Sequence, residues 1–338
     1  MTRLSLAILA AVGLASCRSS TERVPVAPGI VGAAPVDVVV RREPWTFERR
    51  EGQMIETRAH RIHATETSGY IMSRFPLFME MALDHYVSAL TPLPMPEEKL
   101  RTFLFATRDE WASMTRQVMG RHASTYLRIT KGGFASEGRA VLYDIGRRET
   151  FTIAAHEGWH QYVQATFVET LPCWLDEGLA TYMEGYRWDT RHGATPVFLP
   201  WANLERHERL RDAAARGHLV SLRTLLNCTP QELLDESEYG ALTYYAQVWA
   251  LAHFLAEEEP GALHAMLRDA SEGRMARQVA EFTDPVLARR LLRSRKGDAV
   301  FQAYFGADLD AFEARYGAFI DRITRVGSRD AIVRGVRP

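Results

Sequence analysis

Residues 151–185 constrain this 338-residue chain more than any other stretch, because they combine two histidines at helical spacing with a later glutamate. His156, Glu157 and His160 form the pattern H-E-x-x-H, so the two imidazoles are expected one turn apart on one helix face. Glu177 follows His160 after 16 intervening residues. Two imidazoles and a carboxylate can bind one zinc ion and leave a fourth position open, as in catalytic rather than structural zinc sites. His156, His160 and Glu177 are therefore the predicted zinc ligands.

The surroundings of this pattern favour a metal site over two histidines on a surface helix. The sequence before His156 is compatible with a helix, and Pro172 marks the start of a second helix that carries Glu177. That glutamate stands in the apolar context WLDEGLA, where an unpaired carboxylate would be costly and a metal ion would remove the cost. Glu157 is expected to act as the general base on a zinc-activated water.

Three segments, HEGWHQY, PCWLDEGLATYMEG and YYAQVWALAHFL, carry a family resemblance that extends over residues 100–257. They resemble the gluzincin metallopeptidases and, more narrowly, an uncharacterised peptidase-MA-like domain family common in bacterial secreted and lipid-anchored proteins. The resemblance implies His156, His160 and Glu177 as zinc ligands and Glu157 as the base.

The same resemblance implies a tyrosine that stabilises the oxyanion, well after the third ligand. Tyr244 and Tyr245 come 67 and 68 residues after Glu177, close to the family distance. Alignment of the apolar run that follows favours Tyr245, and Tyr239 is a weaker candidate. Packing in the core is the alternative role for these tyrosines.

The N-terminus has the features of a bacterial lipoprotein signal. Arg3 is positively charged, and residues 4–14 are mainly apolar but too few to span a membrane. The following Leu14-Ala15-Ser16-Cys17 resembles a lipobox, so residues 1–17 are expected to be the signal and Cys17 the lipidated residue. An ordinary secretory signal or a short membrane anchor is the alternative. We expect the protein to be anchored by lipid to a membrane of the cell envelope.

Composition adds two constraints on partners and on cysteine chemistry. A net charge of -1 gives no argument for a nucleic-acid partner. Cys173 and Cys228 could pair in an oxidising compartment, but two cysteines do not make a disulfide framework. The spacing of Cys173 does not fit the zinc pattern.

Periodicity and the resemblance together predict an α+β fold with a zincin-like core, made of a small twisted sheet and the H-E-x-x-H helix. Residues 18–55 are expected to be a tether and an irregular segment, residues 56–190 the zincin-like subdomain and residues 191–330 a helical C-terminal subdomain. Strands are predicted at 57–67 and 100–106, and residues 134–144 are predicted to be either a strand pair or one strand bent around Gly138. Helices are predicted at 73–90, 108–119, 150–167, 172–185, 203–216, 242–257, 263–270, 284–293 and 307–325.

Residues around the expected ligands suggest further roles. Thr181 and Glu184 share the helix face of Glu177, and either can orient a metal-bound imidazole. Exposure at the surface is the alternative for Glu184. The charged run 205–216 is expected to be a solvated helix face.

These features predict a zinc-dependent metallopeptidase that hydrolyses a peptide or protein substrate. The chain lacks a G-A-M-E-N-like stretch before the site, which favours an endopeptidase over an aminopeptidase. The alternatives are a non-catalytic zinc-binding envelope protein and a hydrolase of a non-peptide amide or ester. Glu157 argues against the first alternative, because binding zinc does not require it whereas hydrolysis does.

Overall fold

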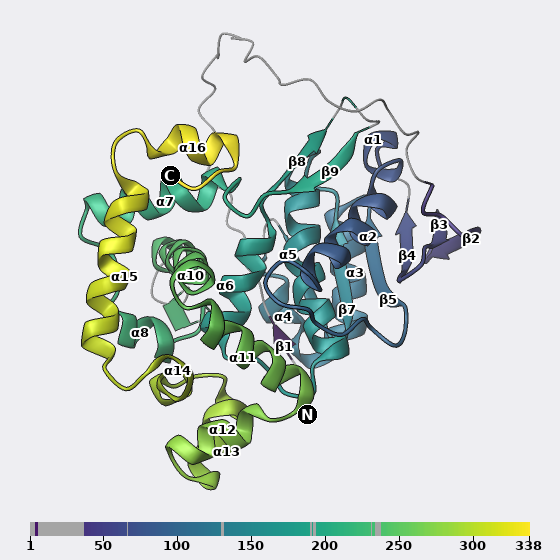
Figure 1. Cartoon of the computed structure of the whole chain (residues 1–338). Coiled ribbons are helices and arrows are strands. Elements are labelled where there is room, and N and C mark those ends of the chain that lie inside the picture. The colour runs from purple at the N-terminus through teal and green to yellow at the C-terminus, as the bar shows by residue number, and fades with distance from the viewer. Residues whose placement is uncertain are drawn as a thin grey trace.

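The chain folds into a sheet-containing N-terminal half and a helical C-terminal half, as predicted for an α+β protein (Figure 1). The structure is a computed structural model and describes residues 4–5, 37–65, 67–129, 132–189, 191, 194–230, 232–233 and 238–338. Helices α5 (Glu149–Thr166) and α6 (Cys173–Met183) lie between the two halves. Residues 6–36, including Cys17, lie outside the described part, so the lipobox and tether stay predictions. No helix of the described residues is long and apolar enough to cross a membrane.

The main sheet is mixed, with the strand order β1-β6-β7-β5-β4-β3-β2 among the described residues. β4 and β7 each run parallel to β5, and the other neighbours are antiparallel. A separate hairpin is formed by β8 and β9. The strands are β1 (Leu4–Ser5), β2 (Arg41–Phe47), β3 (Arg50–Glu56), β4 (His60–Thr65), β5 (Leu100–Phe105), β6 (Gly133–Ser136), β7 (Arg139–Tyr143), β8 (Tyr186–Asp189) and β9 (Thr195–Phe198).

The predictions of β4, β5 and the pair β6–β7 are confirmed, but the prediction of irregular structure up to residue 55 is wrong. Residues 41–56 form the hairpin β2–β3. Most of its side chains are exposed or half-buried, so the hairpin lacks the apolar alternation by which a strand is recognised in a sequence.

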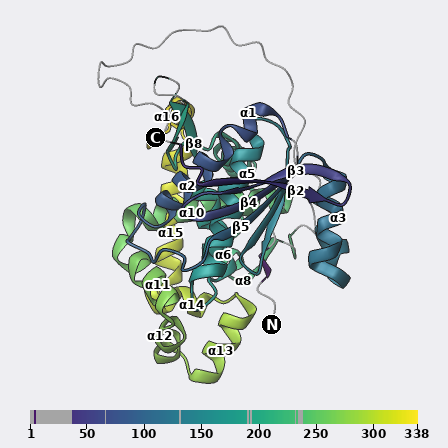
Figure 2. The ribbon, with the colours of Figure 1, turned by 90° about the vertical axis from the view of Figure 1, so that its right-hand side faces the viewer.

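Successive side chains of β5 point to opposite faces of the sheet, and each face has its own cluster of apolar side chains. Thr102 and Leu104 face α5, where the Thr102 hydroxyl donates to the side-chain oxygen of Gln161. Phe103 and Phe105 contribute to a second cluster with Trp111 of α3 (Arg108–Met119). Figure 2 shows α3 on one side of the sheet and α2 (Phe75–Tyr86) on the other. Because of this division, α5 is enclosed between the sheet, α2 and α6.

The predicted helices are all present. In the N-terminal half these are α2, α3, α5 and α6. In the C-terminal half they are α7 (Leu204–Ala215), α10 (Glu238–Glu258), α11 (Pro260–Glu272), α13 (Pro285–Ser294) and α15 (Leu309–Thr324). Shorter helices without a matching prediction are α1 (Gly69–Met72), α4 (Ala123–Tyr126), α8 (Leu222–Asn227), α12 (Met275–Phe282), α14 (Asp298–Phe305) and α16 (Ser328–Arg334).

Two glycines allow the helices around the site to approach closely. A Cβ at Gly158 of α5 would lie 2.7 Å from the Tyr86 hydroxyl, which donates a hydrogen bond to the backbone oxygen of Ala155. A Cβ at Gly178 of α6 would lie 2.8 Å from the backbone oxygen of Val248 in α10. Any larger residue would push α2 away from α5, or α10 away from α6.

Candidate metal centre

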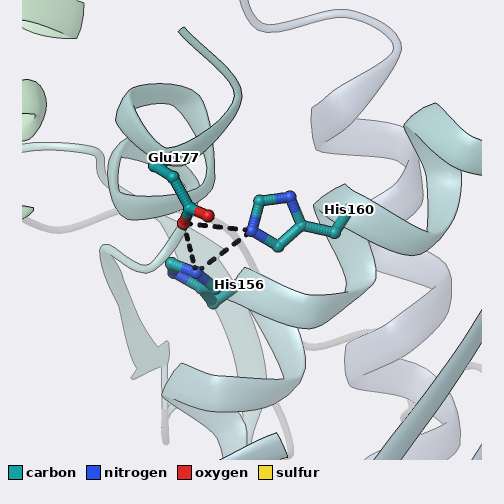
Figure 3. A group of neighbouring side chains, drawn as sticks. All are labelled: His156, His160 and Glu177. Atoms are coloured by element: carbon teal, nitrogen blue, oxygen red, sulfur yellow. Dashed lines mark hydrogen bonds and ion pairs between the residues drawn. The ribbon is translucent and has the colours of Figure 1, made fainter. Parts of the chain in front are cut away.

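The three predicted ligands meet at one point between α5 and α6 (Figure 3). The His156 and His160 Nε2 atoms are 3.3 Å apart, and the Glu177 Oε2 atom lies 3.4 and 3.3 Å from them. All three side chains are buried. Among the described residues, this is a group of metal-binding side chains whose donor atoms converge closely enough to hold a metal ion.

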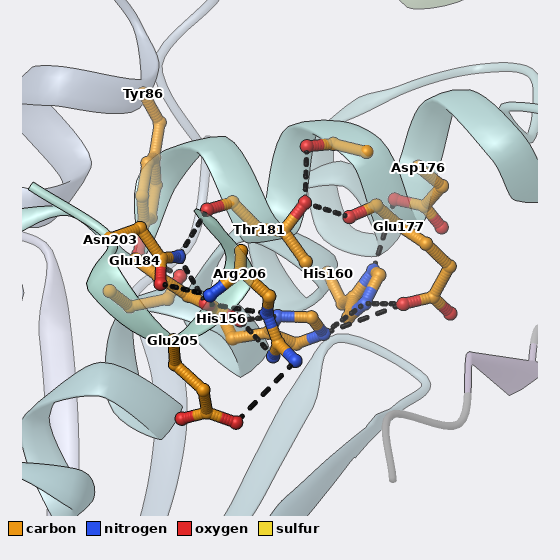
Figure 4. Close-up of polar contacts among 12 residues, drawn as sticks. Tyr86, His156, His160, Asp176, Glu177, Thr181, Glu184, Asn203, Glu205 and Arg206 are labelled. Carbon is orange, nitrogen blue, oxygen red and sulfur yellow. Dashed lines mark hydrogen bonds and ion pairs between the residues drawn. The ribbon is translucent and has the colours of Figure 1, made fainter. Parts of the chain in front are cut away.

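Two carboxylates fix the orientation of the imidazoles. His156 Nδ1 is 2.8 Å from Glu184 Oε1, and His160 Nδ1 is 3.0 Å from Asp176 Oδ1. Since a carboxylate accepts hydrogen bonds, each Nδ1 donates its proton and each Nε2 lone pair is left to face the centre. Figure 4 shows both pairs beside Glu177. The prediction that Glu184 orients an imidazole is therefore confirmed.

Two arginines of the C-terminal half, one buried and one partly buried, neutralise these carboxylates. Arg206 of α7 binds Glu184 through Nη2 to Oε1 at 2.8 Å, and Asn203 donates to the other oxygen of the same carboxylate at 2.6 Å. Arg295, which follows α13, donates to Asp176 through its guanidinium. The prediction of a solvated face at 205–216 is thus wrong for Arg206, whose side chain is only 2% exposed. Its partner lies 22 residues away, so local sequence does not reveal the pair.

The charged side chains around the candidate ligands favour the binding of a cation. Burial lowers the pKa of His156 and His160, but contacts with the neighbouring carboxylates raise both pKa values above the ordinary value. Burial raises the pKa of Glu184, but Arg206 and His156 hold that pKa down at about 2. When both imidazoles are neutral and all four acids are ionised, Glu157, Asp176, Glu177 and Glu184 outweigh the two arginines by two negative charges. A divalent cation would balance that excess.

Glu157 and the predicted ligand Glu177 both have buried carboxylate oxygens without a hydrogen-bond partner among the described residues, one oxygen in Glu177 and two in Glu157. Burial raises the pKa of Glu157 to about 7. A Cβ at Gly133 would lie 3.3 Å from Glu157 Cγ, so the edge of β6 runs beside this side chain. A buried, unpartnered carboxylate costs stability and so points to a role in chemistry rather than in packing.

The candidate tyrosines of α10 are neighbours, with ring centres 5.9 Å apart. The Tyr245 ring is 6.2 Å from the His156 ring, and the guanidinium carbon of Arg206 lies 5.3 Å from the centre of the Tyr245 ring. Burial raises the pKa of Tyr244, and the charges of Cys173, Cys228 and Glu177 raise it further. Both tyrosines thus lie near the candidate ligands, and Tyr245 is the one whose ring lies beside His156. The side chain of Tyr239 lies outside the described residues.

Residues 150–275 match the family described as "Protein of unknown function (DUF1570)". The matched segment is less than half of the chain, but it contains α5, α6 and α10, and hence the three ligands, Glu157 and Tyr245. The match agrees with the expectation of an uncharacterised family and assigns no activity. No curated protein matches this chain.

Several neighbours of the centre were not predicted, or were assigned differently. Asp176, Asn203 and Arg295 gave no sequence signal beyond their proximity to Glu177 or their charge. Tyr126 of α4 was also missed: its hydroxyl is buried without a partner among the described residues, and after burial the charge of Glu157 raises its pKa. The Thr181 hydroxyl donates to backbone oxygens of α6 at 3.0 and 2.8 Å rather than to an imidazole.

Cys173 and Cys228, the two cysteines other than Cys17, are not ligands of the candidate metal site. Cys173 and Cys228 are both free, and Cys173 is not among the converging donors. The Cys173 side chain is buried at the first residue of α6. These cysteines therefore do not form the disulfide that an oxidising compartment would allow.

Proposed function

We propose that this protein is a zinc-dependent metallopeptidase of the gluzincin type, with a zincin-like core, anchored to a membrane of the cell envelope by lipid at Cys17. The observation that carries the proposal is the triangle of buried donor atoms from His156, His160 and Glu177. Each imidazole in this triangle already has its other nitrogen bound to a carboxylate, as metal-bound histidines usually do.

The dimensions of the donor triangle support zinc. A tetrahedral ion with bonds of roughly 2.0–2.1 Å separates its ligand atoms by roughly 3.3 Å. The three donor–donor distances here are 3.3, 3.4 and 3.3 Å. Two nitrogens and one oxygen are also a common zinc ligand set. When bound, zinc supplies Lewis acidity and lowers the pKa of a water in the open fourth position.

The residues of the chain itself would then move protons and hold the substrate. Glu157, with its pKa near 7, is suited to accept a proton from water and to return it to the leaving amine. Tyr245, beside His156, is the proposed donor to the oxyanion. The edge of β6, which pairs antiparallel with Leu4–Ser5 in this structure, is suited to pair with an extended peptide. Glu157 lies beside that edge.

One observation favours a second candidate, a zinc-binding envelope protein without catalysis. His156, Glu157, His160 and Glu177 are all at most 2% exposed. A buried centre suits a structural ion, whereas a substrate must reach a catalytic one. The unpartnered carboxylate of Glu157 still favours catalysis, because a structural zinc site does not require such a group.

The decisive experiment combines metal analysis with a peptide-library cleavage assay on the full-length protein. The variants are Glu157→Gln and, as a control, Glu149→Gln at the exposed start of the same helix. We expect all three proteins to bind about one zinc ion per chain. Glu157→Gln should lose cleavage by a factor of about 100 or more, and Glu149→Gln should not.

Any other result would contradict one specific claim of the proposal. Absence of zinc from the wild type would refute the metal centre. Zinc binding with equal cleavage by Glu157→Gln would refute the role of Glu157. Zinc binding without cleavage of any peptide by the wild type would favour the non-catalytic protein or, if amide or ester probes are hydrolysed, a non-peptide hydrolase.

A further inference from the structure

A cavity of about 460 Å³ lies away from the metal ligands, at the end of the molecule where β8 and α16 meet. In Figure 1, α16 lies at the upper left above α7, and β8 lies in the upper middle of the molecule. The cavity is also lined by residues of α1 and by the residues just before α5. Its volume is within the range of small-molecule sites. None of the metal ligands lines it.

Three arginines line this cavity, and none of them has an acidic partner in the part of the chain that the structure describes. Arg147, Arg148 and Arg187 form no ion pair with the described residues, although Arg147 lies 4.9 Å from the centre of the Tyr70 ring. The nearby Asp189 is bound to Arg191 instead. Burial lowers the pKa of Arg187, and the like charge of Arg148, which lines the same cavity, lowers it further.

The remaining walls of the cavity are aromatic and aliphatic. Tyr186 and Trp188 of β8 contribute rings, and Ile332 of α16 contributes a branched aliphatic side chain. The Tyr186 hydroxyl donates to the backbone oxygen of Arg148, which fixes β8 against the start of α5. Unpaired guanidiniums thus stand beside an apolar surface in one concave site.

We propose that this cavity binds the oxyanion group, phosphate or carboxylate, of a small ligand whose body is aromatic or aliphatic. Guanidinium groups present paired donors that match the oxygens of both anions. An anion would compensate the like charges of Arg148 and Arg187, and the ring or chain of the ligand would cover Trp188 and Ile332. This site is separate from the proposed peptidase chemistry and does not rest on it.

Calorimetric titration of the full-length protein with phenyl phosphate, inorganic phosphate and phenol tests the proposal. The test variant is Arg148→Gln/Arg187→Gln. The control is Arg289→Gln/Arg293→Gln, which removes two exposed arginines of α13. All four positions are exposed, so equal melting temperatures are expected and confirm that both variants fold.

We expect phenyl phosphate to bind the wild type and the control equally, and more tightly than either phosphate or phenol. The test variant should bind phenyl phosphate at least about tenfold more weakly. Equal affinity of the test variant and the wild type would overturn the proposal, and so would the absence of binding to the wild type at millimolar phenyl phosphate.

Discussion

At the scale of single residues, the metal centre repeats one arrangement twice. An imidazole donates to a carboxylate, and an arginine from the C-terminal half binds the same carboxylate. Asp176, Glu177 and Glu184 all belong to α6 or to the residue that follows it. α5 therefore supplies the nitrogen donors, and α6 supplies both the third donor and the groups that orient the other two.

The variants Asp176→Asn and Glu184→Gln should each weaken zinc binding by a factor of about 10–100. An amide is a poorer acceptor for the Nδ1 proton, so the imidazole loses its fixed orientation and part of its basicity. Competition with a chromophoric chelator measures the affinity. Glu205→Gln changes an exposed acid next to Arg206 and serves as the control. Unchanged affinity in both test variants would contradict the proposed orienting role.

The variant Tyr245→Phe should bind zinc as the wild type does and lose kcat by a factor of about 100–1,000, because it removes the proposed donor to the oxyanion. Tyr244→Phe is the matched control, since Tyr244 is the neighbouring buried tyrosine of the same helix. Peptide cleavage and metal content are measured on both variants. Full activity of Tyr245→Phe would show that Tyr245 packs in the core and is not the donor to the oxyanion.

At the scale of elements, the close approach of α10 to α6 brings Tyr245 beside His156. The approach depends on Gly178, whose missing side chain leaves room for the backbone oxygen of Val248. Val248 follows Tyr245 by one turn of α10. The distance between these helices therefore determines where the tyrosine lies.

The variant Gly178→Ala should destabilise the fold by about 1–3 kcal/mol, because a Cβ would lie 2.8 Å from that backbone oxygen and α10 would have to move. Chemical denaturation measures the free energy of unfolding. Gly317→Ala is the control: it lies within α15 with no atom within 4 Å of an added Cβ. There, alanine should stabilise by about 0.5–1 kcal/mol through helix propensity. Equal effects of the two substitutions would show that the contact with α10 is not tight.

Local sequence predicted the elements that carry the ligands but not the elements that complete the site. The spacing of His156 and His160 and the proline before α6 were enough to predict α5 and α6, because helix periodicity and capping are local properties. Arg206 and Arg295 could not be predicted as partners of Glu184 and Asp176, because such pairs depend on how α7 and α13 pack. The hairpin β2–β3 was missed for the opposite reason: its pairing is local, but its side chains are too polar to show a strand pattern.

At the scale of the whole molecule, both halves share one core. A single cluster of buried apolar side chains extends from Ile55 in β3 to Ile332 in α16. It includes Trp159 of α5 and Trp174 of α6, so these tryptophans pack the centre of the molecule. A shared core couples the stability of the sheet to that of the helices around it.

This core makes stability depend on pH through a buried histidine. His253 of α10 stacks on Trp201 with ring centres 3.7 Å apart, and burial lowers its pKa to about 3. A histidine of the unfolded chain has a pKa of about 6.5, so below that pH the unfolded state binds the proton more readily than the folded state. This contribution to stability is complete above pH 6.5 and decreases as the pH falls from about 6.5 towards about 3.

Between pH 7 and pH 5, His253 should account for a loss of roughly 2 kcal/mol in the free energy of unfolding. His253→Phe, which keeps a ring on Trp201, should lose less stability than the wild type over this interval. His122→Phe changes an exposed histidine and should lose as much as the wild type. Urea unfolding at the two pH values measures the difference. Identical losses in His253→Phe and the wild type would assign the pH dependence to other groups.

Arg295, which binds Asp176, is synthesised long after the predicted metal ligands. The ligands and Glu157 are all made before residue 178, whereas the arginine that neutralises the carboxylate behind His160 is made more than a hundred residues later. A growing chain thus contains every donor atom long before the donors are held in place. We therefore expect a nascent or truncated chain that lacks Arg295 to carry the motif without the geometry that the proposed activity needs.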